Sequence, residues 1–132
     1  MSIEIINSSS QTVAANGQLA LGQINIRRCD GSVVYNGSNS ITFRDNGIYQ
    51  VIVKVDATAT TAAQTLKVAL AYNGTVSTVA SASSTTTDAG DVRTLVIPKK
   101  IRICGNPLTI TLVNSDTVST IYQNLIIDIV KE

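Results

Sequence analysis

The chain contains no histidine, and this absence narrows its chemistry more than any other feature. Histidine-dependent triads, histidine general bases and most zinc sites need an imidazole, so these kinds of site are excluded. The 132 residues also lack tryptophan and include only two cysteines, which lie too far apart in sequence to form a metal-binding pair. No glycine-rich segment has the strand–loop–helix context of a phosphate site. We therefore predict a protein that is not an enzyme, with no catalytic residue, no cofactor and no metal.

Charge and long apolar runs are also scarce. Ten Lys and Arg residues stand against nine Asp and Glu residues, a net charge of +1, which gives no reason to expect a nucleic-acid partner. The sequence contains no run of about 18 apolar residues, so no membrane span is predicted. Its N-terminus has no basic region followed by an apolar stretch, so no secretory signal is predicted. The length predicts one domain over residues 1–132, made in a cytoplasm.

The carboxylates provide no stronger indication of a site. Five of them fall in predicted turns or loops: Asp30, Asp45, Asp88, Asp91 and Asp116. We interpret them as side chains that cap turns, since Asp commonly bonds to the backbone two residues on. A calcium site made by Asp88 with Asp91 is the alternative, although nothing here resembles an EF-hand loop.

Val, Ile and Thr are abundant, and good helix formers never cluster with a helical period, so the composition predicts an all-β fold. The central unit is Ile41–Val55: a short strand, a turn at Asp45-Asn46-Gly47 and a long strand. Side chains in a strand alternate between two faces. One face of the long strand is wholly apolar and is predicted to be core: Tyr49, Val51, Val53 and Val55. The other face mixes Ile48 and Ile52 with Gln50 and Lys54.

The last strand has the same property. In Ile121–Val130, one face carries Leu125, Ile127 and Ile129, and straight alternation places Tyr122, Ile126 and Val130 on the other. Two neighbouring strands of this kind would expose a continuous apolar surface, which monomers do not normally do. We therefore expect the second face to be covered by another copy of the chain.

Alternation between turn dipeptides recurs along the rest of the sequence and predicts about ten antiparallel strands in a sandwich or jelly roll. Pro98 falls inside a long strand and predicts an edge position or a bulge, because proline cannot donate to a sheet. The polar stretches Ala57–Gln64 and Ser83–Gly90 are predicted loops. The other predicted strands are Ile3–Ile6, Thr12–Ala15, Gln18–Leu21, Ile24–Arg28, Ser32–Tyr35, Leu66–Ala71, Val76–Ala82, Asp91–Ile103 and Leu108–Val113.

These features resemble the jelly-roll superfamily of tumour necrosis factor (TNF) and the complement globular heads. Gly47-Ile-Tyr49 resembles the Gly-x-Tyr strand of that family, and the Asn73-Gly74 turn after Leu66–Tyr72 resembles its Asn-Gly hairpin. More narrowly, Gln11–Gly17, Ile24–Arg28 and Leu108–Asn114 look like small proteins encoded by phages and prophages of gut Firmicutes. The collagen-like stalk of many relatives is missing.

The resemblance implies a non-enzymatic structural protein of a phage particle, of the capsid-decoration or head-fibre type. Its partners would be other virion proteins and itself as a homotrimer, and it would reside in the virion after release by lysis. The expected trimer interface contains Ile48, Ile52, Tyr122, Ile126 and Val130. The attachment end would be the termini, because the first and last strands would be neighbours in such a fold.

Three alternatives stay open. The protein could instead be a carbohydrate- or ligand-binding adhesion module, for example for a host-surface glycan, with its site on Ala57–Gln64 and Ser83–Gly90. The basic groups Arg27–Arg28 and Lys99–Arg102 could oppose edge aggregation or steer the protein towards an acidic capsid surface. Cys29 and Cys104 each follow a strand and precede a turn, so they could form a disulfide at one end of the sandwich or be two separate small buried side chains.

Overall fold

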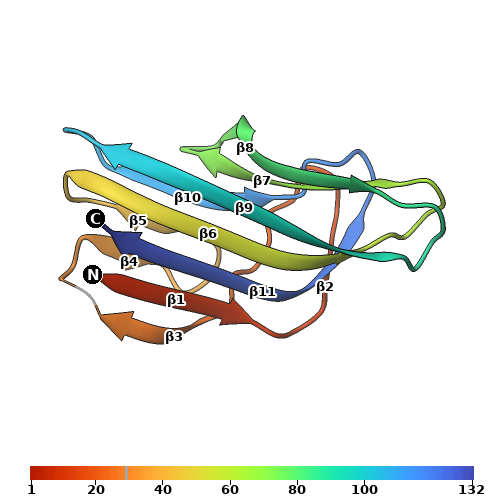
Figure 1. Cartoon of the computed structure of the whole chain (residues 1–132), viewed down its shortest axis with the longest axis horizontal. Coiled ribbons are helices and arrows are strands. Elements are labelled where there is room, and N and C mark those ends of the chain that lie inside the picture. Colours follow the sequence, from red (N-terminus) through yellow and green to blue (C-terminus); the bar gives the residue numbers. More distant parts are fainter. Residues whose placement is uncertain (29) are drawn as a thin grey trace.

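The computed structural model describes residues 1–28 and 30–132, and these residues form eleven strands and no helix (Figure 1). In particular, the described residues contain no helix long and apolar enough to cross a membrane. The predicted all-β class is confirmed. The strands are β1 (Ser2–Asn7), β2 (Gln11–Val13), β3 (Gln23–Arg28), β4 (Val33–Tyr35), β5 (Ile41–Phe43), β6 (Gly47–Thr58), β7 (Thr65–Tyr72), β8 (Thr75–Thr85), β9 (Val92–Ile103), β10 (Leu108–Val113) and β11 (Thr120–Lys131).

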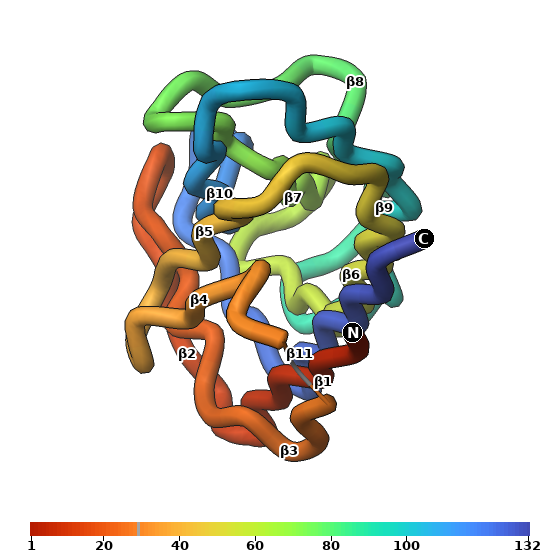
Figure 2. The backbone as a smooth tube through the Cα atoms, turned by 90° about the vertical axis from the view of Figure 1, so that its left-hand side faces the viewer, coloured from red at the N-terminus to blue at the C-terminus, as the bar shows by residue number. Residues whose placement is uncertain are grey.

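The strands form two antiparallel sheets that face each other. The six-stranded sheet has the order β3-β1-β11-β6-β9, with β2 paired to the start of β11. The five-stranded sheet has the order β4-β5-β10-β7-β8. Figure 2 looks at the two layers from the end of the molecule that carries both termini. This arrangement is a TNF-like jelly roll, as the sequence predicted.

The core lies between the sheets and is centred on β6. Tyr49, Val51, Val53 and Val55 are all fully buried, which confirms the predicted core face of this strand. The Tyr49 ring meets Phe43 edge-on at 4.8 Å between centroids, and its hydroxyl donates to the Asp45 carbonyl at 2.7 Å. The ring is therefore buried while its polar atom has a partner.

The first and last strands are neighbours. β1 and β11 pair in register from Ser2 with Val130 to Asn7 with Leu125, so both termini lie at the same end of the sandwich (Figures 1 and 2). This adjacency was predicted. The predicted edge position of Pro98 is also confirmed, because β9 is the outermost strand of its sheet.

Three polar segments differ from the sequence prediction. The predicted loop Ala57–Gln64 begins as strand, because Ala57 and Thr58 belong to β6 and pair with Arg93 and Val92. Ser83 to Thr85 belongs to β8, where these residues pair with Lys67 to Thr65, so the loop begins only at Thr86. The small polar side chains of β8 hid its strand character. The Gln18–Leu21 segment is not a strand and contributes only an isolated bridge from Gln18 to Val113.

A buried polar network fixes the end of the sandwich opposite the termini. The Gln64 amide nitrogen donates to Asp116 at 2.8 Å and to the Thr120 hydroxyl at 2.9 Å. Its amide oxygen accepts the backbone N–H of Thr60 at 2.8 Å. One glutamine thus joins the segment before β7 to the segment before β11, which makes the loop ordered rather than free.

Gly22 provides a test of how tightly β3 enters the sheet. Its φ is +91°, and a Cβ added there would lie 2.0 Å from the Ile6 carbonyl oxygen. Gly74 has a similar φ of +88° but no atom within 4 Å of such a Cβ. We predict that Gly74→Ala costs about 1 kcal/mol of unfolding free energy, for backbone strain alone. Gly22→Ala should cost about 3 kcal/mol or more, because the backbone itself must move.

Urea-unfolding midpoints of the two variants and the parent chain, measured under one condition, make this comparison. Equal losses for Gly22→Ala and Gly74→Ala would contradict the close approach of β3 to β1.

Candidate functional site

The outer surface of the six-stranded sheet is the most unusual surface of the molecule. Among the described residues, nine large hydrophobic side chains are exposed, and six of these lie on this surface. We call this surface the apolar face. Its exposed members are Ile26, Ile48, Ile52, Val92, Val96 and Val130, and the half-buried Ile6 and Ile126 and the exposed Pro98 lie among them.

The strand register makes these side chains neighbours. Ile6 pairs with Ile126, Ile126 with Lys54, and Lys54 with Val96. Directly paired residues in a sheet have their Cβ atoms about 5 Å apart, so side chains on one face touch across the strands. The face is therefore one continuous surface across four strands and not a scatter of single exposed residues.

Four of the five predicted interface residues lie on the apolar face. Ile48, Ile52 and Val130 are exposed, Ile52 by 47%, and Ile126 is half-buried beside them. Their placement on one sheet surface agrees with the prediction, while their role in an interface between copies stays a prediction.

Tyr122 is the exception, and the prediction for its face is wrong. Its side chain is 0% exposed, and its hydroxyl donates to the Lys67 carbonyl on the opposite sheet. The cause is a β-bulge in β11 between Gln123 and Ile126, where Asn124 has a φ of 55°. The extra residue moves Tyr122 to the core side of the strand, and this burial raises its pKa. The consecutive polar residues Gln123-Asn124 were the available signal.

The contribution of β3 to the apolar face was not predicted, again because a register shift interrupts the alternation. Ile24 and Ile26 share a face under straight alternation, but they pair with Ile5 and Glu4, which are consecutive residues of β1. The register shift places Ile24 against the core and leaves Ile26 exposed on the apolar face. Val92 and Val96 in β9 were also missed, although apolar residues on both faces of that strand indicated a second apolar surface.

A carboxylate pair interrupts the apolar face. Glu4 and Asp128 are register partners on β1 and β11, and the Asn25 amide donates to Glu4 at 2.8 Å. The hydrogen bond from Asn25, followed by that from Asp128, lowers the pKa of Glu4. Desolvation and then the neighbouring Glu4 raise the pKa of Asp128. Because two nearby carboxylates repel when both are ionised, the pair is a pH-sensitive element of this surface.

Two further polar clusters border the face. Asp56 accepts hydrogen bonds from Asn124 at 3.0 Å and from Thr94 at 2.7 Å, which lower its pKa and hold the bulge of β11 against β6. At the end with the termini, Glu132 accepts from Gln50 at 2.7 Å and pairs with Lys100 at 2.9 Å. These contacts lower the pKa of Glu132.

The other candidate residues have structural roles or lie outside the described part. Asp91 accepts the backbone N–H groups of Asp88 at 2.9 Å and Thr87 at 3.2 Å, so it caps the turn that it was predicted to cap. The described residues contain no group of three or more side chains that could hold a metal ion. Cys104 is exposed, so the alternative that it is a small buried side chain is wrong, while its possible disulfide with Cys29 lies outside the described residues.

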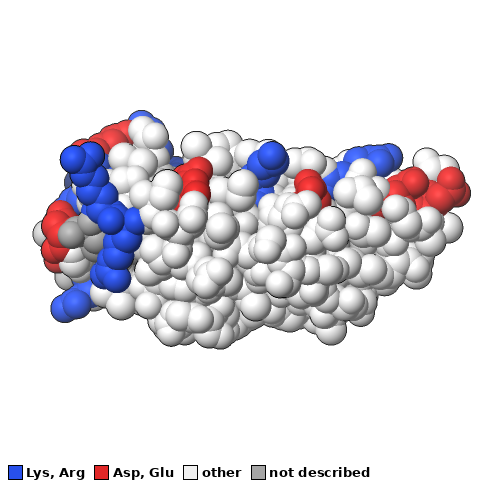
Figure 3. Space-filling model, turned by 90° about the horizontal axis from the view of Figure 1, so that it is seen from below, with Lys and Arg blue, Asp and Glu red and all other residues white. Residues whose placement is uncertain are grey.

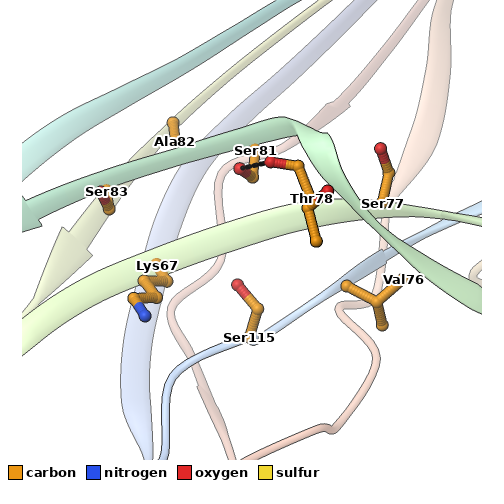
Figure 4. Close-up of a pocket in the computed structure, with 8 residues that line it drawn as sticks. All are labelled: Lys67, Val76, Ser77, Thr78, Ser81, Ala82, Ser83 and Ser115. Carbon is orange, nitrogen blue, oxygen red and sulfur yellow. Dashed lines mark hydrogen bonds between the residues drawn. The ribbon is translucent and has the colours of Figure 1, made fainter.

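The opposite sheet carries shallow hollows near the predicted ligand-binding loops. One of about 330 Å³ lies beside the irregular part of β8 and is drawn in Figure 4. A second, of about 390 Å³, lies over the Gln64 network. Lys67 lines both hollows, the other lining side chains are small, aliphatic or polar, and neither lining includes an aromatic ring. A sugar site usually offers an aromatic platform, so these hollows are a weaker candidate than the apolar face.

Comparison with known proteins identifies the fold and nothing narrower. No protein-family model matches the chain, and no curated protein matches it. The Eiger TNF of S. frugiperda has a TM-score of 0.75 and 11% identity, covering 100% of this chain and 92% of that one. The zebrafish complement 1qA globular domain has a TM-score of 0.66 and 5% identity, covering 98% of this chain and 94% of that one. Murine APRIL at pH 8.0 has a TM-score of 0.70 and 13% identity, covering 99% of this chain and 98% of that one. The TM-scores indicate a shared jelly-roll fold, and identities this low indicate nothing beyond the fold.

We predict that Ile52→Glu converts the assembled protein into monomers. Ile52 lies in the apolar face between Asp128 and Pro98, and covering such a side chain contributes about 2 kcal/mol in each copy. Val79→Glu is the matched control, because Val79 is 78% exposed on the five-stranded sheet. Light scattering should give monomers for Ile52→Glu and the parent mass for Val79→Glu. The same mass for both variants would remove the apolar face as the interface.

We also predict that Asp128→Asn stabilises the protein at pH 7 by about 0.5 kcal/mol, the scale of a cross-strand charge pair. The raised pKa of Asp128 means that ionising it costs the folded state more than the unfolded state. This cost is complete above the folded pKa and is absent below the ordinary value of 3.8. The gain should therefore disappear as the pH falls below that value.

Thermal unfolding of Asp128→Asn and the parent across pH 3 to 8 measures this dependence. Asp88→Asn is the control, since it removes a carboxylate from the loop at the far tip. A gain for Asp128→Asn that stays constant with pH would contradict the charge origin of the effect.

Proposed function

We propose that this protein is a non-enzymatic, homotrimeric structural protein of a phage particle, of the capsid-decoration or head-fibre type. The gathering of six exposed large apolar side chains on one face of the sheet is the observation that carries the proposal. Monomeric proteins rarely expose a contiguous apolar surface, and such a surface usually marks an interaction site. A second copy of the chain is the simplest cover, because cyclic symmetry hides the same face in every copy.

The fold supports a binding role without turnover. The similar structures are TNF and complement globular domains, and their jelly-roll fold is often trimeric. The chain has no histidine, and its candidate surface consists of aliphatic side chains bordered by hydrogen-bonded carboxylates. Such a surface can bury area and hold a shape. The phage setting rests on the resemblance of Gln11–Gly17 and Leu108–Asn114 to small phage-encoded proteins.

A ligand-binding adhesion module is the second candidate, and the position of Lys67 between two hydroxyl-lined hollows is the observation that favours it. Ser77, Thr78 and Ser81 in one hollow offer hydroxyl groups to a sugar (Figure 4). This candidate predicts binding to a glycan array that Lys67→Ala weakens, with no requirement for a particle.

Quantitative mass spectrometry of purified phage particles tests the proposed function. The particles are those whose genome encodes this chain, washed free of unbound protein in a density gradient. We expect the chain in the particle fraction. Its copy number, calibrated against the major capsid protein, should correspond to a multiple of three chains at each attachment point. Absence of the chain from washed particles, together with its recovery from the lysate as free protein, would contradict a structural role.

A further inference from the structure

Charge is distributed unevenly along the molecule although the total is only +1. The residues Arg27, Ile3, Ile129, Val51 and Lys99 pair side by side and form one row across the six-stranded sheet. We call everything from this row to the chain termini the basic end. It includes the turns around Asp45 and Gly105 and the segment from Asp30 to Ser32, which meets Arg44 through a backbone hydrogen bond.

The basic end holds seven of the ten Lys and Arg residues but only three of the nine Asp and Glu residues. It therefore carries a net +4, and the rest of the chain carries a net −3. In Figure 3 most of the blue atoms form a band across this end, and red atoms mark the far tip. The seven cations are Arg27, Arg28, Arg44, Lys99, Lys100, Arg102 and Lys131, and the three anions are Asp30, Asp45 and Glu132.

Much of this charge is open to solvent. Lys100 pairs with Glu132 at 2.9 Å, and the Lys100 side chain is still 66% exposed. Arg44 and Arg102 are both exposed. Lys131 is half-buried at the same end, with its Nζ 5.7 Å from the centroid of the Tyr49 ring. The field of the basic end is therefore only partly cancelled by its own carboxylates.

An assembly through the apolar face would concentrate this charge. In a cyclic assembly, every copy of a given end lies at the same height along the symmetry axis. Three copies of the basic end therefore form one ring, and three times +4 gives +12. A ring with this net positive charge attracts a surface of net negative charge and favours one orientation of the two.

We propose that the basic end docks this protein onto an acidic protein surface of the phage particle. This inference rests on the proposed function and adds the chemistry of the partner. A protein surface fits better than a nucleic acid, because Asp30, Asp45 and Glu132 lie among the cations and would repel a uniform chain of phosphates. Tyr49 and Phe43, which pack against each other at this end, are both fully buried and offer no stacking platform for bases.

Co-sedimentation with particles stripped of this protein tests the proposal. The variant Arg44→Gln with Arg102→Gln removes two charges from the basic end. Arg93→Gln removes one charge from elsewhere and is the matched control for the single variant Arg44→Gln, which is measured beside the double variant. Light scattering first establishes that all the proteins have the same assembly state. A single-stranded oligonucleotide of 20 nucleotides is then added as the competing polyanion.

At about 50 mM salt, we expect the double variant to bind particles at least tenfold more weakly than the parent, and the control variant to bind within twofold of it. At about 0.5 M salt the parent should lose most of this advantage, since salt screens exposed charges. Binding by the parent that neither the variants nor salt change would overturn the docking surface alone. Equal losses for Arg44→Gln and Arg93→Gln would also overturn it, as would displacement by the oligonucleotide at stoichiometric concentration. Failure of the parent to bind at any salt concentration would instead overturn the proposed function.

Discussion

The structure depends on one constraint: β6 carries apolar side chains on both of its faces, and both faces need cover. Within one chain, only the face with Tyr49 and the three valines after it receives that cover, from the five-stranded sheet. Each apolar Å² left in water forfeits about 25 cal/mol relative to burial. The rest of the six-stranded sheet repeats this condition, because β9 and β11 also present aliphatic side chains outwards. The core of the sandwich is therefore fully buried within one chain, whereas the outer face of the six-stranded sheet still exposes apolar side chains.

The polar residues of that surface show how it is kept specific. Lys54, Gln50, Glu4 and Asp128 interrupt the apolar side chains, and all four lie in register with them. A face made only of isoleucine and valine would stick to any apolar surface, whereas placed charges penalise a wrong partner or a shifted register. Hydrogen bonds near the two bulges also keep the surface specific: Asn124 donates to Asp56, and Asn25 donates to Glu4. They fix the register between β11 and β6 and between β3 and β1, which decides which side chains face outwards.

Sequence alone predicted the architecture well and the surface less well. Alternation in Ile48–Val55 and the turn at Asn46-Gly47 were strong signals, because period-two patterning and Asn-Gly turns are local properties. The face of Tyr122 was not predictable from alternation, since the bulge at Asn124 is stabilised by Asp56 from a distant strand. The strand Ser83–Thr85 was missed because its small polar side chains resemble a loop, while its pairing with β7 depends on the tertiary fold. Long-range partners decided each of these cases.

The central claim is that the apolar face is buried between copies of the chain, and the mass in solution tests it most directly. Sedimentation equilibrium of the unmodified protein at about 1 µM should give three times the chain mass of 13.9 kDa, without dissociation on tenfold dilution. A trimer that stays intact on this dilution would agree with the account. A stable monomer of 13.9 kDa at that concentration would contradict it.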